Sequence, residues 1–198
     1  PQAQVAYSQK RLGSGRWRMP SFFYVQDFGS FQNRALIRLV ALDTNQPMLK
    51  QLNLIQRAFK NSEDSIWKIV AGHHQIRSFS KKYGDNKELI DSLLPTLQKY
   101  RVDIYLCGHS HNLQLVAKTF EPLYVISGAG GARIRKIKND TTGSLIYGAE
   151  RHGFVKIEAN PEALSIQFIK NKNEARQTYT LTRECLTNVN IAECLNES

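Results

Sequence analysis

The sequence has no long apolar run, few cysteines and comparatively few acidic residues. No stretch approaches the roughly 18 consecutive apolar residues of a membrane-spanning helix, and no signal peptide is visible. Hydrophobic residues make up 41% of the 198 positions and charged residues 22%, a composition typical of a globular domain that buries its own core. We therefore expect a single folded domain and no membrane span.

Basic residues outnumber acidic ones. The 27 Lys and Arg against 17 Asp and Glu give a formal net charge of +10. Such an excess raises the local concentration of anions, so phosphate compounds, acidic glycans, nucleic acids and anionic membranes are all candidate partners. The densest basic run is Arg133-Ile134-Arg135-Lys136-Ile137-Lys138. We favour a solvated strand or loop edge for this run, with an anion-binding patch as the alternative.

Cysteine occurs three times. Cys107 lies within an apolar run, where a buried and unreactive thiol is expected. Cys185 and Cys194 flank a short polar tail, residues 184–198, and their spacing would close a small loop. A disulfide there would indicate an oxidising compartment, whereas two free thiols are the alternative.

Apolar patterns predict an α/β domain over residues 1–183. Residues 1–20 are polar with scattered turn residues. Helices are expected over 48–60 and 86–99, the second kinked or restarted at Pro95. The expected early strands are 22–28, 35–42, 66–71 and 102–107, with a hairpin connection at 29–33. The expected later strands are 113–118, 123–127, 153–159, 164–170 and 177–181, short and mainly antiparallel.

Four of the five histidines follow two strands that a helix connects, which are therefore expected to be parallel. His73 and His74 follow the first of these strands, His109 and His111 follow the second, and a glycine precedes each pair. The carboxyl ends of parallel strands share one sheet edge, where open α/β sheets place ligand sites. Neutral imidazole is a common ligand of borderline divalent metals, and glycine allows a close backbone approach. A metal site is therefore predicted at this edge.

The segments around these histidines also match a known pattern. They are Val70-Ala71-Gly72-His73-His74, Leu93-Leu94-Pro95 before Tyr100, and Val102 to Gln114 with Gly108-His109-Ser110-His111-Asn112 inside it. The sequence resembles the calcineurin-like metallophosphoesterases, and within them the purple, or tartrate-resistant, acid phosphatases. The resemblance extends through Ala6-Tyr7-Ser8, residues 20–24, Leu42-Asp43-Thr44, residues 126–130 and Gly153-Phe154, and it covers the chain to about residue 183.

The resemblance implies a layered α/β/β/α sandwich and hydrolysis of phosphate monoesters by a metal-activated hydroxide. It places His73 and His109 on one metal ion and His111 on the other. It gives His74 and Asn112 supporting or substrate-facing positions. The two metal ions would be iron with iron, zinc or manganese. No catalytic residue is identified.

The chain departs from the family pattern on its N-terminal side. The family's aspartate-and-histidine strand end, its Gly-Asp segment with a bridging aspartate and tyrosine, and its Gly-Asn-His motif are all missing, so three of roughly seven metal ligands remain. We therefore expect the C-terminal two-thirds of a longer chain, inactive without the missing ligands. A sandwich without its first strands is expected to expose an apolar sheet face or edge.

Individual positions depart from the pattern as well. Gln75 stands where the family usually has proline, and Ser110 stands where many members have aspartate. Tyr83 occupies a position where the acid phosphatases often carry a histidine, and Lys81 and Lys82 precede it. A tyrosine or lysine that protonated the leaving group would alter the pH profile. No role is assigned to Tyr83 or Lys82.

The leading hypothesis is an acid-phosphatase-like metallohydrolase of phosphorylated small molecules or phosphoproteins, in a secreted or periplasmic setting. No specific nucleic acid partner is expected. A phosphodiesterase or nucleotidase on the same fold is one alternative. A non-catalytic basic module that binds anions is the other, and its binding would survive the change of His109 and His111 to alanine.

Overall fold

The structure is a computed structural model that describes residues 2–10, 16–171, 176–187 and 191–197. The α-helices are Gln2–Gln9 (α1), Leu49–Phe59 (α2), Lys87–Ser92 (α3) and Leu94–Lys99 (α4). The strands are Tyr24–Phe31 (β1), Arg34–Ala41 (β2), Ser65–Ala71 (β3), Ile104–Cys107 (β4), Leu113–Val116 (β5), Leu123–Ser127 (β6), Leu145–Ala149 (β7), Gly153–Ala159 (β8), Ala163–Lys170 (β9), Gln177–Thr182 (β10) and Asn196–Glu197 (β11). Short 3₁₀ turns lie at Ser62–Asp64, Cys185–Thr187 and Ile191–Glu193.

The strands of the described residues form two sheets. The first has seven strands in the order β1-β2-β3-β4-β6-β5-β7, and the second has four in the order β11-β10-β9-β8. Strands β2, β3, β4 and β6 are parallel, which confirms the parallel pairing predicted for the two strands that carry histidines. The second sheet is antiparallel throughout. The predicted α/β class is confirmed.

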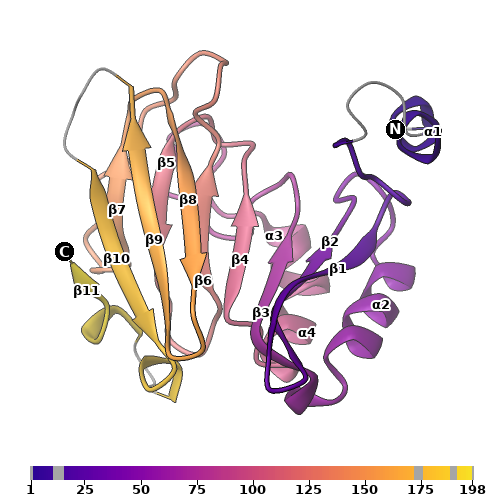
Figure 1. Cartoon of the computed structure of the whole chain (residues 1–198). Coiled ribbons are helices and arrows are strands. Elements are labelled where there is room, and N and C mark those ends of the chain that lie inside the picture. The colour runs from indigo at the N-terminus through magenta and orange to yellow at the C-terminus, as the bar shows by residue number, and fades with distance from the viewer. Residues whose placement is uncertain (1, 11–15, 172–175, 188–190, 198) are drawn as a thin grey trace.

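The layers are a helical layer, the seven-stranded sheet and the four-stranded sheet. Helices α2, α3 and α4 lie on one face of the first sheet, and strands β8 to β10 lie against its other face at the β5–β7 end (Figure 1). No α-helix of the described residues covers the outer face of the second sheet (Figure 1). Three of the four layers of the expected sandwich are therefore formed by this part of the chain.

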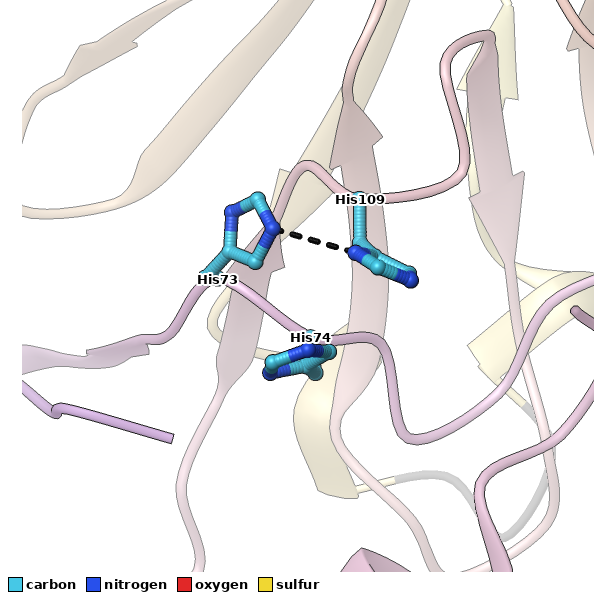
Figure 2. A group of neighbouring side chains, drawn as sticks. All are labelled: His73, His74 and His109. Atoms are coloured by element: carbon cyan, nitrogen blue, oxygen red, sulfur yellow. Dashed lines mark hydrogen bonds between the residues drawn. The ribbon is translucent and has the colours of Figure 1, made fainter. Parts of the chain in front are cut away.

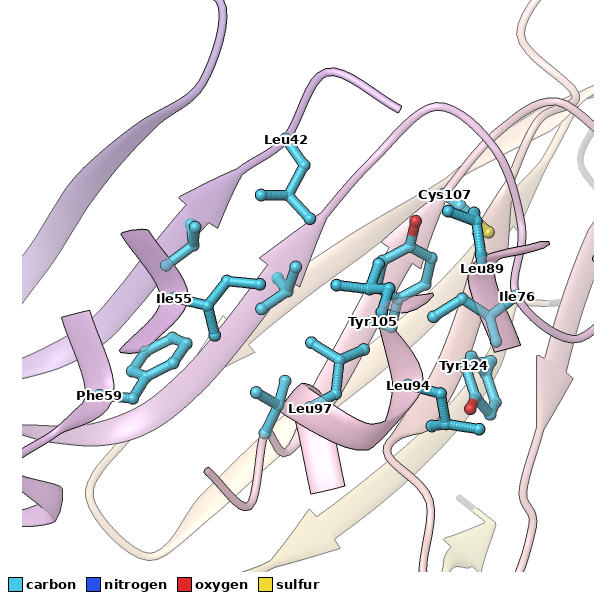
Figure 3. Close-up of a cluster of buried hydrophobic side chains, with 14 of the residues drawn as sticks. Leu42, Ile55, Phe59, Ile76, Leu89, Leu94, Leu97, Tyr105, Cys107 and Tyr124 are labelled. Atoms are coloured by element: carbon cyan, nitrogen blue, oxygen red, sulfur yellow. The ribbon is translucent and has the colours of Figure 1, made fainter. Parts of the chain in front are cut away.

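The helical layer seals a core of aliphatic and aromatic side chains. Ile55 and Phe59 of α2, Leu97 of α4 and Tyr105 of β4 are each at most 2% exposed (Figure 3). The helix expected over 86–99 is interrupted as predicted, because Pro95 occupies the first turn of a new helix and lacks the N–H that would continue the old one. This core fixes the positions at which β3 and β4 end.

A second core lies between the two sheets, and polar contacts at its border join the second sheet to the first. The indole N–H of Trp67 on β3 donates to the carbonyl of Asn160 at 2.7 Å. Arg183, directly after β10, donates to the carbonyl of Ile66 at 2.7 Å and lies over the Trp67 ring at 5.1 Å. The guanidinium of Arg183 also approaches the buried carboxylate of Asp103 at 3.6 Å. The second sheet is thereby tied to strands β3 and β4.

The first two strands extend beyond the second sheet, so part of the first sheet is uncovered (Figure 1). Strand β1 is an outer strand of the seven-stranded sheet, and its apolar side chains Val25, Phe28 and Phe31 are exposed. The exposure expected for a sandwich without its first strands is therefore present at β1.

Several elements differ from the expected ones. Residues 2–9 form α1, which buries no side chain, and residues 145–149 form β7, which sequence patterns did not reveal. The hairpin connection is only Gln32-Asn33, because β1 continues to Phe31. Segment 184–198, expected as a polar tail, packs Cys185 and Ile191 into the second core, although residues 188–190 and 198 lie outside the described part. Cys185 and Cys194 form a disulfide, and Cys107 is a buried free thiol.

Candidate metal centre

Two strand ends bring the histidine loops together. Ala71 of β3 pairs with Leu106 of β4, so the residues that follow these strands emerge at the same sheet edge. Main-chain hydrogen bonds continue past the strands: Gly72 N–H donates to the carbonyl of Leu106 at 3.0 Å, and Gly108 N–H donates to the carbonyl of His73 at 3.1 Å. The two loops are therefore held in register up to the histidines.

His73, His74 and His109 form a cluster. One ring nitrogen of each lies within 4.8 Å of the others, and Nε2 of His73 is 3.0 Å from Nδ1 of His109 (Figure 2). The ring centroids of the three pairs are 4.5 to 5.0 Å apart. Among the described residues, this is the one group of three histidines, cysteines or carboxylates close enough to share a metal ion.

His111 lies outside this cluster. Its backbone has a φ of 49°, in the left-handed region that few side chains adopt, and its Nδ1 lies 3.2 Å from the carbonyl oxygen of Arg133. The structure thus brings together His73 and His109 of the three predicted ligands. His74, which had been predicted to support the site or to face substrate, lies with them. His111, predicted as a ligand of the other metal ion, remains a prediction.

His74 is held in place from two sides. The Thr44 hydroxyl lies 2.8 Å from its Nδ1 and accepts a hydrogen bond from its main-chain N–H at 3.1 Å. The phenol of Tyr105 donates to its carbonyl at 2.8 Å. A Cβ at Gly72 would lie 2.6 Å from the Tyr105 hydroxyl and 2.7 Å from Cγ2 of Thr44, so only glycine fits between them.

The electrostatic environment favours the neutral form of two cluster imidazoles, those of His73 and His109. Burial lowers the pKa of His73, and the neighbouring charges of His74 and His111 lower it further. Burial likewise lowers the pKa of His109, with added contributions from the other cluster histidines, His111 and Lys82. A neutral imidazole offers the lone pair that a metal ion requires.

A buried polar network lies beneath the two loops, and it contains Asn112. The Asn112 side chain is fully buried, with its NH₂ donating to the carbonyl of Arg135 at 3.3 Å and its oxygen accepting from Gln114 at 2.8 Å. Gln114 also accepts from Phe79 N–H at 2.8 Å and donates to the Ser78 hydroxyl at 3.1 Å. The amide of Asn112 is therefore turned into the protein and supports the loops.

Sequence patterns did not identify Thr44, Gln114 or Arg77 as part of the site. Arg77 makes a bidentate pair with Glu121, at 2.6 and 2.9 Å, and a further pair with Asp85 at 2.8 Å. These contacts close the loop between β3 and α3. The spacing between partners, up to 44 residues, left no local signal by which the sequence could have revealed them.

Tyr83 reaches the cluster from that same loop. Its ring centroid is 4.3 Å from that of His109, and the Lys82 ammonium lies 5.0 Å from the Tyr83 ring.

The other two positions that depart from the family pattern are buried. Gln75 stands where the family usually has proline, and its side chain donates to the carbonyl of Gly84 at 3.1 Å. Ser110 is buried, with its hydroxyl 3.1 Å from that of Ser78.

A mixed sheet backed by helices, with imidazoles gathered at the carboxyl edge of its parallel strands, is an arrangement typical of metallohydrolases. Comparison with known proteins gives this class a family. The model for calcineurin-like phosphoesterases matches residues 7–113, and the model for the iron/zinc purple acid phosphatase-like protein C matches residues 121–177. The chain belongs to the calcineurin-like phosphoesterase family.

Purple and tartrate-resistant acid phosphatases are similar to most of the chain. Mouse tartrate-resistant acid phosphatase type 5 is 29% identical over 91% of this chain and 62% of its own length. The pig enzyme of the same name is 30% identical over 85% of this chain and 56% of its own length. Purple acid phosphatase 4 of Arabidopsis thaliana is 36% identical over 52% of this chain and 30% of its own length. The chain thus spans less than two-thirds of each of these relatives.

Solved structures agree on the fold. The Plasmodium protein GAP50, described as the anchor in the inner membrane complex, superposes with a TM-score of 0.76 at 20% identity, over 91% of this chain and 61% of that one. The yellow lupin purple acid phosphatase PPD1 gives a TM-score of 0.72 at 17% identity, over 91% of this chain and 35% of that one. No helix of the described residues is long and apolar enough to cross a membrane.

Proposed function

We propose that this chain carries part of the metal centre of a phosphate monoester hydrolase, and that His73, His74 and His109 bind one of its metal ions. The single observation that supports this most directly is the convergence of three imidazoles at one sheet edge. Family membership supports the reaction class, and similarity to acid phosphatases supports monoesters over diesters.

The donor set fits a divalent metal ion. Three imidazole nitrogens are the ligand set of several zinc sites, and the 3.0 Å between His73 Nε2 and His109 Nδ1 is close to the roughly 3.3 Å expected between two ligands of one tetrahedral ion. When bound, such ions polarise a phosphoryl oxygen and lower the pKa of a water molecule. The second ion of the proposed dinuclear centre would take His111 as a ligand, together with carboxylates that are not in this cluster.

The chain's own residues orient these ligands. If Nδ1–H of His74 donates to the Thr44 hydroxyl, the Nε2 lone pair is free and fixed in direction, which is how neighbouring groups usually select the tautomer of a metal-binding histidine. Tyr105 holds the His74 carbonyl, and Gly72 allows the close approach of both. The disulfide between Cys185 and Cys194 supports a secreted or periplasmic setting.

Metal titration tests the proposal. Zinc binding to the purified chain is measured by calorimetry for the wild type and for His74→Ala, His109→Ala, His111→Ala and His152→Ala. We expect His74→Ala and His109→Ala to weaken zinc binding at least about tenfold, because each removes a ligand. His152, an exposed histidine whose Nδ1 contacts the carbonyl of Ala129, serves as the matched control and its change should leave affinity unaltered.

The outcomes separate the ligand sets. If His109→Ala and His111→Ala weaken zinc binding and His74→Ala does not, the result would favour the ligand set that the family resemblance implies. It would overturn the proposal that His73, His74 and His109 bind one metal ion. Unaltered zinc affinity in all four variants would refute a metal site in this chain. Hydrolysis of p-nitrophenyl phosphate and of bis(p-nitrophenyl) phosphate by the protein then distinguishes a monoesterase from a diesterase.

A further inference from the structure

The basic run of residues 133–138 does not stand free in solvent, because it pairs with the loop that follows the first histidines. Lys81 N–H donates to the carbonyl of Lys136 at 2.8 Å, and Lys138 N–H donates to the carbonyl of Phe79 at 2.7 Å. Ser80 and Ile137 form an antiparallel bridge between these two bonds. Residues 79–82 and 133–138 thus form a short two-stranded structure, named here the basic ribbon.

The basic ribbon is also bonded to the loop that carries the other histidines. Arg135 N–H donates to the carbonyl of His111 at 3.0 Å, and Nδ1 of His111 lies 3.2 Å from the carbonyl of Arg133. The buried side chain of Asn112 donates to the carbonyl of Arg135. The ribbon therefore contacts both histidine loops, at residues 79–82 on one side and at His111 and Asn112 on the other.

The side chains of the ribbon divide by polarity. Ile134 packs against the second core, and Ile137 lies against Gly148 of β7. The side chains that face solvent are cationic: Lys81, Lys82, Arg133, Lys136 and Lys138. The isoleucines anchor the ribbon, and its exposed face carries positive charge next to the metal centre.

Little of this charge is neutralised within the part of the chain that the structure describes. Lys136 pairs with Glu150 at 2.8 Å, and this pair lowers the pKa of that carboxyl. Lys81, Lys82, Arg133 and Lys138 form no ion pair with a described residue. Cations that are gathered on one face without ion-pair partners attract anions more strongly than the same charges spread over the surface.

The ribbon is connected to the cluster by direct contacts. The Lys82 ammonium lies over the Tyr83 ring, and that ring lies 4.3 Å, centroid to centroid, from His109. On the other strand of the ribbon, Lys138 reaches the same loop, with its ammonium 3.7 Å from where a Cβ of Gly84 would be. A substrate with one phosphate at the histidines would hold its neighbouring anionic groups over the ribbon.

We propose that the basic ribbon is a second anion-binding subsite, which selects substrates that carry several phosphate groups in a row. This inference rests on the proposed function, because it assumes that the histidine cluster takes the phosphate that is hydrolysed. Phosphate oxygens accept charge-assisted hydrogen bonds from ammonium and guanidinium groups. The subsite therefore recognises oligophosphates through the groups beyond the one at the metal centre.

The test uses the chain with metal removed by a chelator, and inorganic tripolyphosphate and orthophosphate as probes. Calorimetry measures binding to the wild type, to Lys81→Gln/Lys82→Gln and to Arg133→Gln/Lys138→Gln. Each double variant is expected to weaken tripolyphosphate binding on the order of tenfold. The matched control, Lys60→Gln/Lys99→Gln, removes two exposed cations where α2 and α4 lead into β3 and β4, at the opposite sheet edge, and should change affinity less than about twofold.

Three results decide the matter. Equal losses in the control and in the ribbon variants would show that net charge alone binds tripolyphosphate, and would overturn the subsite. Equal affinities for orthophosphate and tripolyphosphate in the wild type would overturn it as well. The two proposals can also fail separately. If the ribbon variants weaken tripolyphosphate binding but the histidine variants leave zinc affinity unchanged, the subsite is supported and the proposed metal site is refuted. Thermal melts confirm that each exposed-site variant is folded.

Discussion

Asp103 shows how a single buried group makes stability depend on pH. Asp103 lies directly before β4 and is 6% exposed, and its carboxyl accepts a hydrogen bond from the main-chain N–H of Lys68 at 2.7 Å. Burial raises its pKa to about 6, although the N–H bond and the positive charges of Arg183 and Lys68 oppose the rise. The folded protein therefore holds this proton more tightly than the unfolded chain, in which the pKa is about 3.9.

The change Asp103→Asn is expected to remove this pH dependence. Since the folded-state pKa is the higher one, the contribution of Asp103 to the free energy of unfolding of the wild type falls as pH rises from about 4 to about 6 and is constant above that. Across this window, the free energy of unfolding of the variant should rise relative to that of the wild type by on the order of 2–3 kcal/mol. The reason is that the Asn amide still accepts the hydrogen bond from Lys68 N–H but never ionises. Urea unfolding of both proteins at pH 4 and pH 7.5 measures the change.

Titrating groups that do not interact with Asp103 are shared by the two proteins and cancel in the difference between them, whereas the Asp103 charge raises the pKa of Lys68 in the wild type alone. A difference in unfolding free energy that stays constant with pH would show that Asp103 is ionised in the folded state at pH 4 and would contradict the prediction.

At the residue scale, the sequence predicted that His73 and His109 meet, and it did not predict that His74 lies with them. Strand ends and parallel pairing were enough to predict that His73 and His109 converge, and the structure confirms that these two side chains meet. The positions of His74 and His111 depend on side-chain direction. Thr44 turns His74 toward the cluster, and the left-handed backbone at His111 turns that ring toward Arg133. Neither constraint leaves a local sequence pattern.

At the scale of elements, the loops after β4 and β6 come into close main-chain contact. A Cβ built on Gly128 would lie 2.8 Å from the main-chain nitrogen of His111 and closer still to the carbonyl of Gly108. Gly128 N–H donates to the carbonyl of Asn112 at 3.1 Å. Because backbone atoms cannot move aside as the end of a flexible side chain can, the two loops can lie this close together only with glycine at position 128.

The change Gly128→Ala is expected to lower the free energy of unfolding by about 1–3 kcal/mol and to weaken zinc binding, because the added methyl pushes the loop that carries His109. Gly130→Ala is the matched control, since a Cβ there meets no atom within 4 Å. Urea unfolding and zinc calorimetry on both variants measure the two effects. Equal stability and equal zinc affinity in the two variants would show that the loops tolerate separation.

Most elements could be predicted from sequence because their signals are local. Alternating or continuous apolar runs revealed the strands, and Pro95 revealed the break between α3 and α4. Strand β7 was missed because only five residues follow a turn-rich segment and one of them, Gly148, is not a strand former. The short helix α1 buries nothing, so no apolar stripe marked it.

At the scale of the whole molecule, the C-terminal segment closes the space between the sheets at one end. Cys185 is 1% exposed within the second core, and its disulfide to Cys194 spans nine residues with 5.6 Å between the Cα atoms. The segment also supplies Ile191 to that core. Its packing explains why a stretch that reads as a polar tail is part of the fold.

Reduction of this disulfide is expected to lower the free energy of unfolding by about 2–3 kcal/mol, since a loop of this length is released in the unfolded chain. Urea unfolding with and without dithiothreitol measures the loss. The variant Cys194→Ser is the control, because it cannot form the bond and should respond to dithiothreitol by less than about 0.5 kcal/mol. An equal response in wild type and variant would place the effect elsewhere.

An exposed apolar sheet face or edge was expected from the sequence, and the exposed side chains of Val25, Phe28 and Phe31 on β1 agree with that expectation. The packing of the second sheet could not be foreseen, because Arg183 contacts Ile66 across 117 residues and Trp67 contacts Asn160 across 93. Contacts at such separations depend on the complete topology rather than on any local run.

The way the basic ribbon is fastened has an evolutionary consequence. The bonds between its two strands, and the bond from Arg135 N–H to the carbonyl of His111, run between main-chain groups, which every amino acid except proline can supply. Mutations at its exposed positions can therefore accumulate without disturbing the histidine loops. Under the two proposals, a lineage that exchanged the lysines of the ribbon for acidic or neutral side chains would change which anions bind there and keep the proposed metal centre.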